Sequence, residues 1–184
     1  MEIYSPAEDS FLLSEAIEDS LESIDEEKRK HLLFLDMGAG SGIQAESALK
    51  FLNKENIYCV DINKDAVKYI KKLGFQAARS DLFSSPKLKG MKFDIITFNP
   101  PYLPEDDYDK GEDTTGGEKG DEVALTFLIV AKNYLKENGI IFLLVSSLTP
   151  KDKLEEEIKK QGKMKEVVAT KKLFFETLEV WKII

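Results

Sequence analysis

The chain has 184 residues and a formal net charge of −8, so it is long enough for one domain with a sizeable core. The acidic balance disfavours non-specific association with nucleic acid, and no apolar run approaches the roughly 20 residues that a membrane helix needs. Because Cys59 is the only cysteine, His31 is the only histidine and no export leader is evident, we expect a cytoplasmic protein without disulfides or a bound metal.

Helical and strand patterns alternate along the chain. A capping box from Ser5 to Glu8, with Pro6 at the first helical position, predicts an amphipathic helix that buries Phe11 and Leu12. The further elements expected, in chain order, are a strand over 31–35, a helix over 42–52, a strand over 57–60, a helix over 65–73, strands over 75–79 and 93–98, a helix over 121–136, a strand over 140–145, a helix from a cap at Thr149 and Pro150 to Gln161, and two strands within 167–184 joined near Lys171.

This alternation predicts an α/β fold with an open, mostly parallel, seven-stranded sheet and helices on both faces. The last two strands have no helix between them, which predicts a hairpin and therefore one antiparallel strand. Since no linker, repeat or low-complexity segment interrupts the pattern, we expect a single domain over residues 1–184.

A glycine-rich turn follows the first predicted strand, with Asp36 just ahead of Gly38, Ala39, Gly40 and Gly42. Glycine lets the backbone approach a ligand closely, and ligands of open α/β sheets bind at the carboxyl ends of the strands. The G-x-G-x-G spacing differs from the dinucleotide fingerprint and resembles motif I of Rossmann-like class I S-adenosylmethionine-dependent methyltransferases. In those enzymes the acid before the glycines lies near the amino acid portion of the cofactor.

Two more acids end the next two predicted strands. A carboxylate at Asp61 can accept both hydroxyls of a ribose, with Ile62 against the adenine, although the same acid also occurs in NAD proteins. Asp81 and Leu82 end the third strand, where methyltransferases commonly place an acid that faces the adenine amino group. Each acid alone is equally consistent with a helix cap, but their order along the chain favours a cofactor site.

The tetrapeptide Asn99-Pro100-Pro101-Tyr102 follows the strand over 93–98 and resembles the signature of methyltransferases that act on a planar nitrogen. Such a nitrogen is a poor nucleophile because its lone pair is delocalised, and acceptors for its hydrogens can orient it. The Asn99 side-chain oxygen and the Pro100 carbonyl can be those acceptors, while Tyr102 offers a ring for stacking. Alone, the tetrapeptide would also fit a plain turn.

Longer segments resemble HemK-like glutamine N5-methyltransferases of the archaeal and eukaryotic branch. Residues 4–13 are similar to the Y-x-P-x-E-D-T-F-L-L opening of that family, with Ser10 in place of threonine, and residues 116–123 to its G-G-x-x-G segment. The resemblance implies S-adenosylmethionine as cofactor and, as substrate, the glutamine in the Gly-Gly-Gln loop of a class I translation release factor. It implies cofactor binding by Ser10, Asp36, Gly38, Ala39, Gly40, Asp61, Ile62, Asp81, Leu82 and Asn99, and catalysis by Asn99, Pro100, Pro101 and Tyr102.

The resemblance also implies a partner, a small zinc-binding activator subunit that forms a heterodimer with the catalytic chain. The strand over 75–79 is expected at the sheet edge, where Gln76, Ala77 and Ala78 can pair with another chain. On this hypothesis Ala78→Pro abolishes the complex without altering the cofactor residues.

Other functions fit parts of the same pattern. An N6-adenine nucleic-acid methyltransferase would use the tetrapeptide on a flipped base, but the short acidic chain shows no basic channel or target-recognition domain. Methylation of protein lysine would first require a deprotonated amine, and a non-enzymatic binding module would not need the tetrapeptide. The acidic run over 105–113 is either a solvated lid or a surface for a basic substrate segment.

Overall fold

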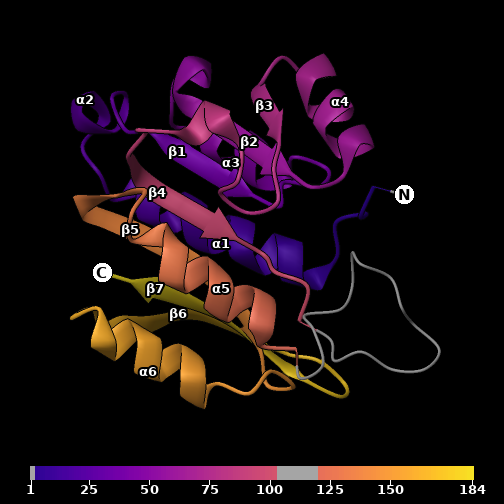
Figure 1. The fold of residues 1–184 in the computed structure, drawn as a ribbon, viewed down its shortest axis with the longest axis vertical. Helices are drawn as coiled ribbons and strands as arrows, with labels where there is room; N and C mark the ends of the chain where they lie inside the picture. The colour runs from indigo at the N-terminus through magenta and orange to yellow at the C-terminus, as the bar shows by residue number, and fades with distance from the viewer. Residues whose placement is uncertain (1–2, 103–119) are drawn as a thin grey trace.

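The computed structural model describes residues 3–102 and 120–184, and Figure 1 shows their arrangement. The acidic run over 105–113 and residues 116–119 of the double-glycine segment lie outside these ranges. The described strands are β1 (Phe34–Met37), β2 (Ile57–Asp61), β3 (Gln76–Arg79), β4 (Phe93–Phe98), β5 (Leu135–Ser146), β6 (Lys165–Lys172) and β7 (Thr177–Ile183). The described helices are α1 (Glu8–Glu22), α2 (Glu26–Arg29), α3 (Ile43–Leu49), α4 (Lys64–Lys72), α5 (Glu122–Ala131) and α6 (Asp152–Lys160), with short 3-10 turns η1 (Lys54–Asn56) and η2 (Pro86–Leu88).

The strands form one seven-stranded sheet in the order β3-β2-β1-β4-β5-β7-β6. Strands β1 to β5 pair in parallel, whereas β7 runs antiparallel to both of its neighbours, β5 and β6. The predicted mostly parallel sheet with one antiparallel strand is therefore confirmed. Because β1 lies between β2 and β4, the strand order reverses at β1, and this is where open α/β sheets form a ligand crevice.

Alternate residues of the central strands pack into two separate cores, one on each face of the sheet. Phe34 and Ile95 pack with side chains of α1, α3 and α4, whereas Leu35 and Ile96 pack with those of α5 and α6. Figure 1 shows α5 and α6 on the side of the sheet opposite to α1. Among residues 3–102 and 120–184, none of the helices combines the length and apolarity that a membrane crossing requires.

Both predicted helix caps are wrong. Ala7 is the N-cap of α1 and no side chain caps that helix, so Ser5 and Pro6 precede it instead of starting it. The N-cap of α6 is Lys151. Thr149 does not cap this helix, because its Oγ1 is buried without a hydrogen-bond partner among the described residues and its N–H donates to the Ser146 carbonyl at the end of β5.

The chain between α1 and β1 also differs from expectation, because a short helix, α2, occupies part of it. Asp25 caps α2 by accepting from the N–H groups of Glu27 and Lys28 at 3.2 and 3.3 Å. His31 follows in a turn, and β1 begins only at Phe34. The predicted strand over 31–35 was therefore right in its second half only.

The junction of α5 and β5 lies earlier than predicted. The helix ends at Ala131, and the Phe93 N–H donates to the Tyr134 carbonyl at 2.8 Å, which starts the pairing of β5 with β4. Gly139, expected to precede the strand, lies inside it where the register shifts. A Cβ there would come within 2.7 Å of the Leu135 side chain, so the irregular strand needs glycine.

Two smaller expectations are also wrong. Phe11 lies on the half-exposed side of α1, because the buried face of the helix is built from Leu12, Leu13 and Ile17. The closing hairpin turns at residues 173–176 and not near Lys171, since β6 continues to Lys172.

Trp181 on β7 is 0 % exposed and packs in the core beside α5 and α6. Replacing it with alanine removes a large buried side chain, so we expect Trp181→Ala to lower the free energy of unfolding by about 3–5 kcal/mol. Phe175→Ala, at a side chain that is 84 % exposed, is the matched control and should change it by less than about 0.5 kcal/mol. Urea denaturation followed by circular dichroism measures both, and equal losses would contradict the packing described here.

Candidate functional site

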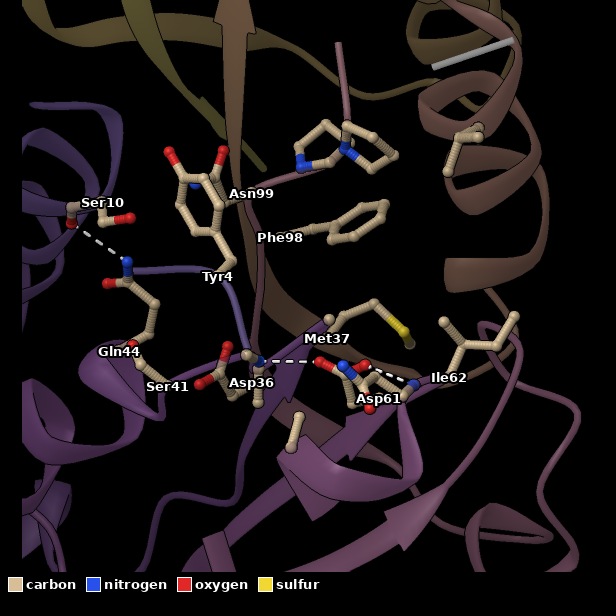
Figure 2. A pocket seen from close by; sticks show the side chains of 18 of the residues that line it. Tyr4, Ser10, Asp36, Met37, Ser41, Gln44, Asp61, Ile62, Phe98 and Asn99 are labelled. Carbon is tan, nitrogen blue, oxygen red and sulfur yellow. Dashed lines mark hydrogen bonds between the residues drawn. The ribbon is translucent and has the colours of Figure 1, made fainter. Parts of the chain in front are cut away.

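A cavity of about 300 Å³ opens at the carboxyl ends of β1, β2, β3 and β4 (Figure 2). In the view of Figure 2, Tyr4 and Asn99 lie above Asp36 and Asp61. The structure brings every site residue predicted from the sequence to this cavity: Ser10, Asp36, Gly38, Ala39, Gly40, Asp61, Ile62, Asp81, Leu82, Asn99, Pro100, Pro101 and Tyr102.

The glycine-rich turn between β1 and α3 depends on its glycines. Gly38 and Gly40 have positive φ angles of 62° and 50°, which residues with a Cβ rarely adopt. A Cβ on Gly38 would also lie 3.1 Å from the Phe98 ring. The turn therefore brings bare backbone to the edge of the cavity.

Asp61 at the end of β2 fastens this turn to the neighbouring strand. One carboxylate oxygen accepts from the Gly40 N–H and the other from the Asn63 N–H, both at 2.7 Å. These bonds fix the carboxylate plane at the cavity wall. Ile62, the next residue, is half-exposed at the mouth of the cavity and offers it an apolar surface.

Asp36 is a buried carboxyl group at the floor of the cavity. Its Oδ2 accepts from the Ala45 N–H at 3.2 Å, in the first turn of α3. Burial raises the pKa of Asp36 well above 3.8, and the nearby charge of Asp61 raises it further, while the Ala45 bond lowers it. A cationic ligand group placed beside Asp36 would offset this cost by favouring the carboxylate.

Asp81 and Leu82 reach the cavity through a tight turn after β3. Leu82 has a φ of 44°, which is unusual for a residue other than glycine. The hydroxyl of Ser80 holds this turn, because it donates to the Leu82 carbonyl and accepts from the Ser85 N–H. The positive φ of Leu82 is energetically unfavourable. The two hydrogen bonds of the Ser80 hydroxyl therefore hold the turn in this conformation.

Asn99, directly after β4, is held by a hydrogen bond that leaves its other polar atom free. Its Nδ2 donates to Asp9 at 3.0 Å, and the Tyr4 hydroxyl donates to the same carboxylate at 3.0 and 3.1 Å. Since a carboxylate only accepts, the amide can be oriented in one way. Asn99 Oδ1 is then buried at the cavity without a hydrogen-bond partner among the described residues. The site presents one acceptor that lacks a donor.

The start of α1 forms the wall beside Asn99. Ser10 donates its hydroxyl to Asp9 at 3.2 Å, and its carbonyl accepts from Gln44 at 3.0 Å. Ser14 completes this chain of bonds by donating to the other end of the Gln44 amide at 2.9 Å. The bonds join α1 to α3 directly behind the cavity.

Tyr102, at the end of the tetrapeptide, is half-buried and packs against the core on the α1 side of the sheet. Burial raises the pKa of its hydroxyl, and the charges of Asp9 and Glu176 raise it further. The phenol therefore stays protonated, and Tyr102 contributes an apolar ring with a neutral tip.

Sequence reasoning missed Tyr4, Asp9 and Gln44 as site residues. Tyr4 and Asp9 belong to the opening segment whose family resemblance was noted, but no role followed from it. Gln44 lies in the first turn after the glycines, and nothing in the sequence distinguishes it from a surface residue. Within residues 3–102 and 120–184, no group of three or more histidine, cysteine or acidic side chains could hold a metal ion.

The strand order, the antiparallel β7 and a cavity bounded by a glycine turn and strand-end acids define a Rossmann-like class I methyltransferase fold. Residues 20–175 match the methyltransferase small domain model, and the chain belongs to that family.

Individual relatives confirm the HemK-like resemblance. The chain is 35% identical to a putative protein N5-glutamine methyltransferase of Methanocaldococcus jannaschii, over 99% of this chain and 93% of that protein. It is 32% identical to the mouse methyltransferase HEMK2, over 92% of this chain and 81% of that protein. Among solved structures, a chain of the E. cuniculi Mtq2–Trm112 complex, responsible for methylation of the termination factor eRF1, matches with a TM-score of 0.78 and 25% identity, over 100% of this chain and 98% of that one.

The raised pKa of Asp36 predicts a pH-dependent stability. The folded state keeps this proton when the unfolded chain has lost it, so the stabilisation is complete below about pH 3.8 and is lost as the pH rises through the folded pKa. We therefore expect Asp36→Asn to gain stability relative to wild type as the pH rises above about 4, where the unfolded chain loses this proton. Urea denaturation across this range measures the difference, and a difference that does not vary with pH would contradict the prediction.

Proposed function

We propose that this chain uses S-adenosylmethionine to methylate the side-chain nitrogen of the glutamine in the Gly-Gly-Gln loop of a class I translation release factor. The observation that carries the proposal is the buried Oδ1 of Asn99, which lacks a donor while Asp9 holds the other end of its amide. The similarity to glutamine methyltransferases over nearly the whole chain supports the same substrate.

The residues around the cavity fit the proposed cofactor. Asp61, which its backbone bonds hold at the cavity wall, would accept ribose hydroxyls, with Ile62 against the adenine and Asp81 and Leu82 beyond it. Asp36 and Ser10 would face the amino acid portion, where the cationic groups of the cofactor offset the cost of burying a carboxylate. When bound, S-adenosylmethionine supplies a methyl group on a sulfonium, and its transfer leaves a neutral thioether and releases one proton from the acceptor nitrogen.

The tetrapeptide would position the acceptor. A glutamine side chain has two N–H donors, and Asn99 Oδ1 and the Pro100 carbonyl would accept one each, which fixes the plane of the amide. Pro100 and Pro101 stiffen the backbone that carries these acceptors. Tyr102 would cover the flat face of the amide. With the nitrogen held in this way, positioning supplies most of the rate enhancement and no general base is required.

The electrostatics of the cavity weigh against the adenine alternative. The charged side chains among its described lining are all acidic, namely Asp9, Asp36, Asp61 and Asp81. Acids repel the phosphates that supply most of the affinity of nucleic-acid enzymes. The same acids would tolerate a lysine, so lysine methylation is kept as a separate outcome of the assay. A cytoplasmic protein with a single domain over 1–184 completes the proposal, and the continuous sheet supports the latter.

The proposal includes a small zinc-binding activator that pairs with β3. This strand lies at the edge of the sheet, as predicted, and the similarity to a chain of the Mtq2–Trm112 complex supports a partner subunit. The Ser80 N–H donates to the Asp61 carbonyl of β2, so by alternation the N–H of Ala78 also faces β2 and that of Ala77 faces outward. Proline at residue 78 would therefore disrupt the fold of this chain, and Ala77 is the better position for the test.

We expect Ala77→Pro to lose the complex, because proline has no N–H to offer an added strand. Co-expression of the chain with the activator, followed by affinity purification and a circular dichroism spectrum of the variant, measures binding and folding together. Ala78→Pro is the matched control. It should lose the complex and also the stability of the chain, because the N–H of Ala78 faces β2. A folded Ala77→Pro chain that still co-purifies with its partner would sink the proposed pairing.

The activity itself is tested with labelled S-adenosylmethionine and a purified class I release factor, with and without the activator. Label should map to the glutamine of the Gly-Gly-Gln loop and be lost with a Gly-Gly-Arg substrate. Asn99→Ala should lower kcat by about 10²-fold or more, since it removes the acceptor that orients the amide. Asn133→Ala, at an exposed asparagine in the turn after α5, should leave kcat unchanged. Label on adenine or on lysine in place of glutamine would refute the proposed substrate.

A further inference from the structure

The tip of the β6–β7 hairpin exposes two adjacent aromatic side chains. Phe174 is 92 % exposed and Phe175 84 %, and their rings meet edge to face with centroids 4.5 Å apart. Single exposed apolar residues are normal, but two neighbouring phenylalanines that leave nearly all of their surface in water are costly. Aromatic side chains at a protruding position are typical anchors of protein interfaces.

This tip lies at the same edge of the sheet as the proposed active site. The Leu173 N–H closes the turn on the Glu176 carbonyl at 2.8 Å, and the Ser147 N–H donates to the Thr177 carbonyl, just beyond the carboxyl end of β5. Since β5 lies between β4 and β7, the tip is two strand spacings, about 10 Å, to the side of β4. Figure 1 shows the hairpin extending beyond the end of β4.

The register shows how far the hairpin projects. Phe98, the last residue of β4, pairs with Leu143, which pairs in turn with Trp181 of β7. The first half of β7, residues 177–180, projects beyond the level of Phe98. The turn with the two phenylalanines projects further still in the same direction. A protein whose acceptor residue enters the cavity beside Asn99 would meet this turn at the rim.

Electrostatic and ionic contacts join the hairpin to the cavity wall. Burial and the charge of Asp9 raise the pKa values of Tyr4 and Tyr102, which line the cavity, and the charge of Glu176 adds to both effects. Ser146 donates its hydroxyl to Glu176, and Lys171 forms an ion pair with Glu8 at the start of α1. These contacts connect the base of the hairpin to the end of β5 and to the start of α1.

We propose that Phe174 and Phe175 form a docking tip for the protein substrate, contacting apolar side chains of the release factor that flank the acceptor loop. This inference rests on the proposed function. The tip does not suit the activator, because β3 is the opposite edge of the sheet from the hairpin. A folded protein with an apolar surface next to its acceptor residue is the occupant that fits.

The test is the double variant Phe174→Ser/Phe175→Ser in complex with the activator, assayed on the intact release factor. We expect KM for the factor to rise about 10-fold or more, as for loss of interface anchors, while kcat and the affinity for S-adenosylmethionine stay near wild type. Met164→Ser is the matched control, because Met164 is 69 % exposed just before β6, at the other end of the hairpin, and its KM should not change.

The outcomes separate this inference from the function on which it rests. If wild type methylates the factor and the double variant has an unchanged KM, the docking tip is refuted and the proposed function stands. If wild type fails to methylate the factor with the activator present, both are refuted. Loss of activator binding, or weaker binding to RNA in place of the factor, by the double variant would also overturn the inference.

Discussion

The parallel pairing of β1 with both β2 and β4 is the constraint on which the rest of the structure depends. The chain runs from β1 to β2 on one side and later returns to β4 on the other side. Because all three strands point the same way, the loops that follow them meet at one edge of the sheet. The glycine turn, Asp61 and Asn99 come from three such loops, and they become neighbours only because their strands share a register. A slip of one residue in any of these strands would turn its side chains to the other face.

The site concentrates carboxylates where water is scarce, and backbone donors make this tolerable. Asp61 is bound by N–H groups of the glycine turn and of its own loop, and Asp36 by the first turn of α3. Asp9 accepts from the backbone N–H of Ser10 at 2.6 Å and also from the side chains of Tyr4 and Asn99. The first two carboxylates thereby hold the backbone of the site, whereas Asp9 orients the amide that faces the substrate.

The proposed binding of cofactor, activator and protein substrate takes place at three different edges of the sheet. The carboxyl edge of the parallel strands forms the cavity, β3 offers unpaired backbone groups at one side, and the β6–β7 hairpin projects two phenylalanines at the other. The antiparallel direction of β7 is what brings the hairpin turn to the carboxyl edge, since a parallel strand there would have placed its preceding connection at the opposite end. The turn between β6 and β7 therefore lies at the same edge as the cavity because β7 runs antiparallel to β5.

The sequence by itself determined the α/β class and many of the residues that line the cavity, because glycine spacing, strand-end acids and the tetrapeptide are local signals read along the chain. It did not determine where α1, α6 and β5 begin. No side chain caps α1, whereas Thr149 bonds back to the end of β5 and Tyr134 accepts from Phe93 of β4. Only the tertiary structure decided that Asp9 would orient Asn99, since these residues lie 90 positions apart. The same holds for the exposed phenylalanines, which a pattern of apolar residues would have assigned to the core. Such outcomes depend on which strands become neighbours, and that is settled when the whole sheet packs.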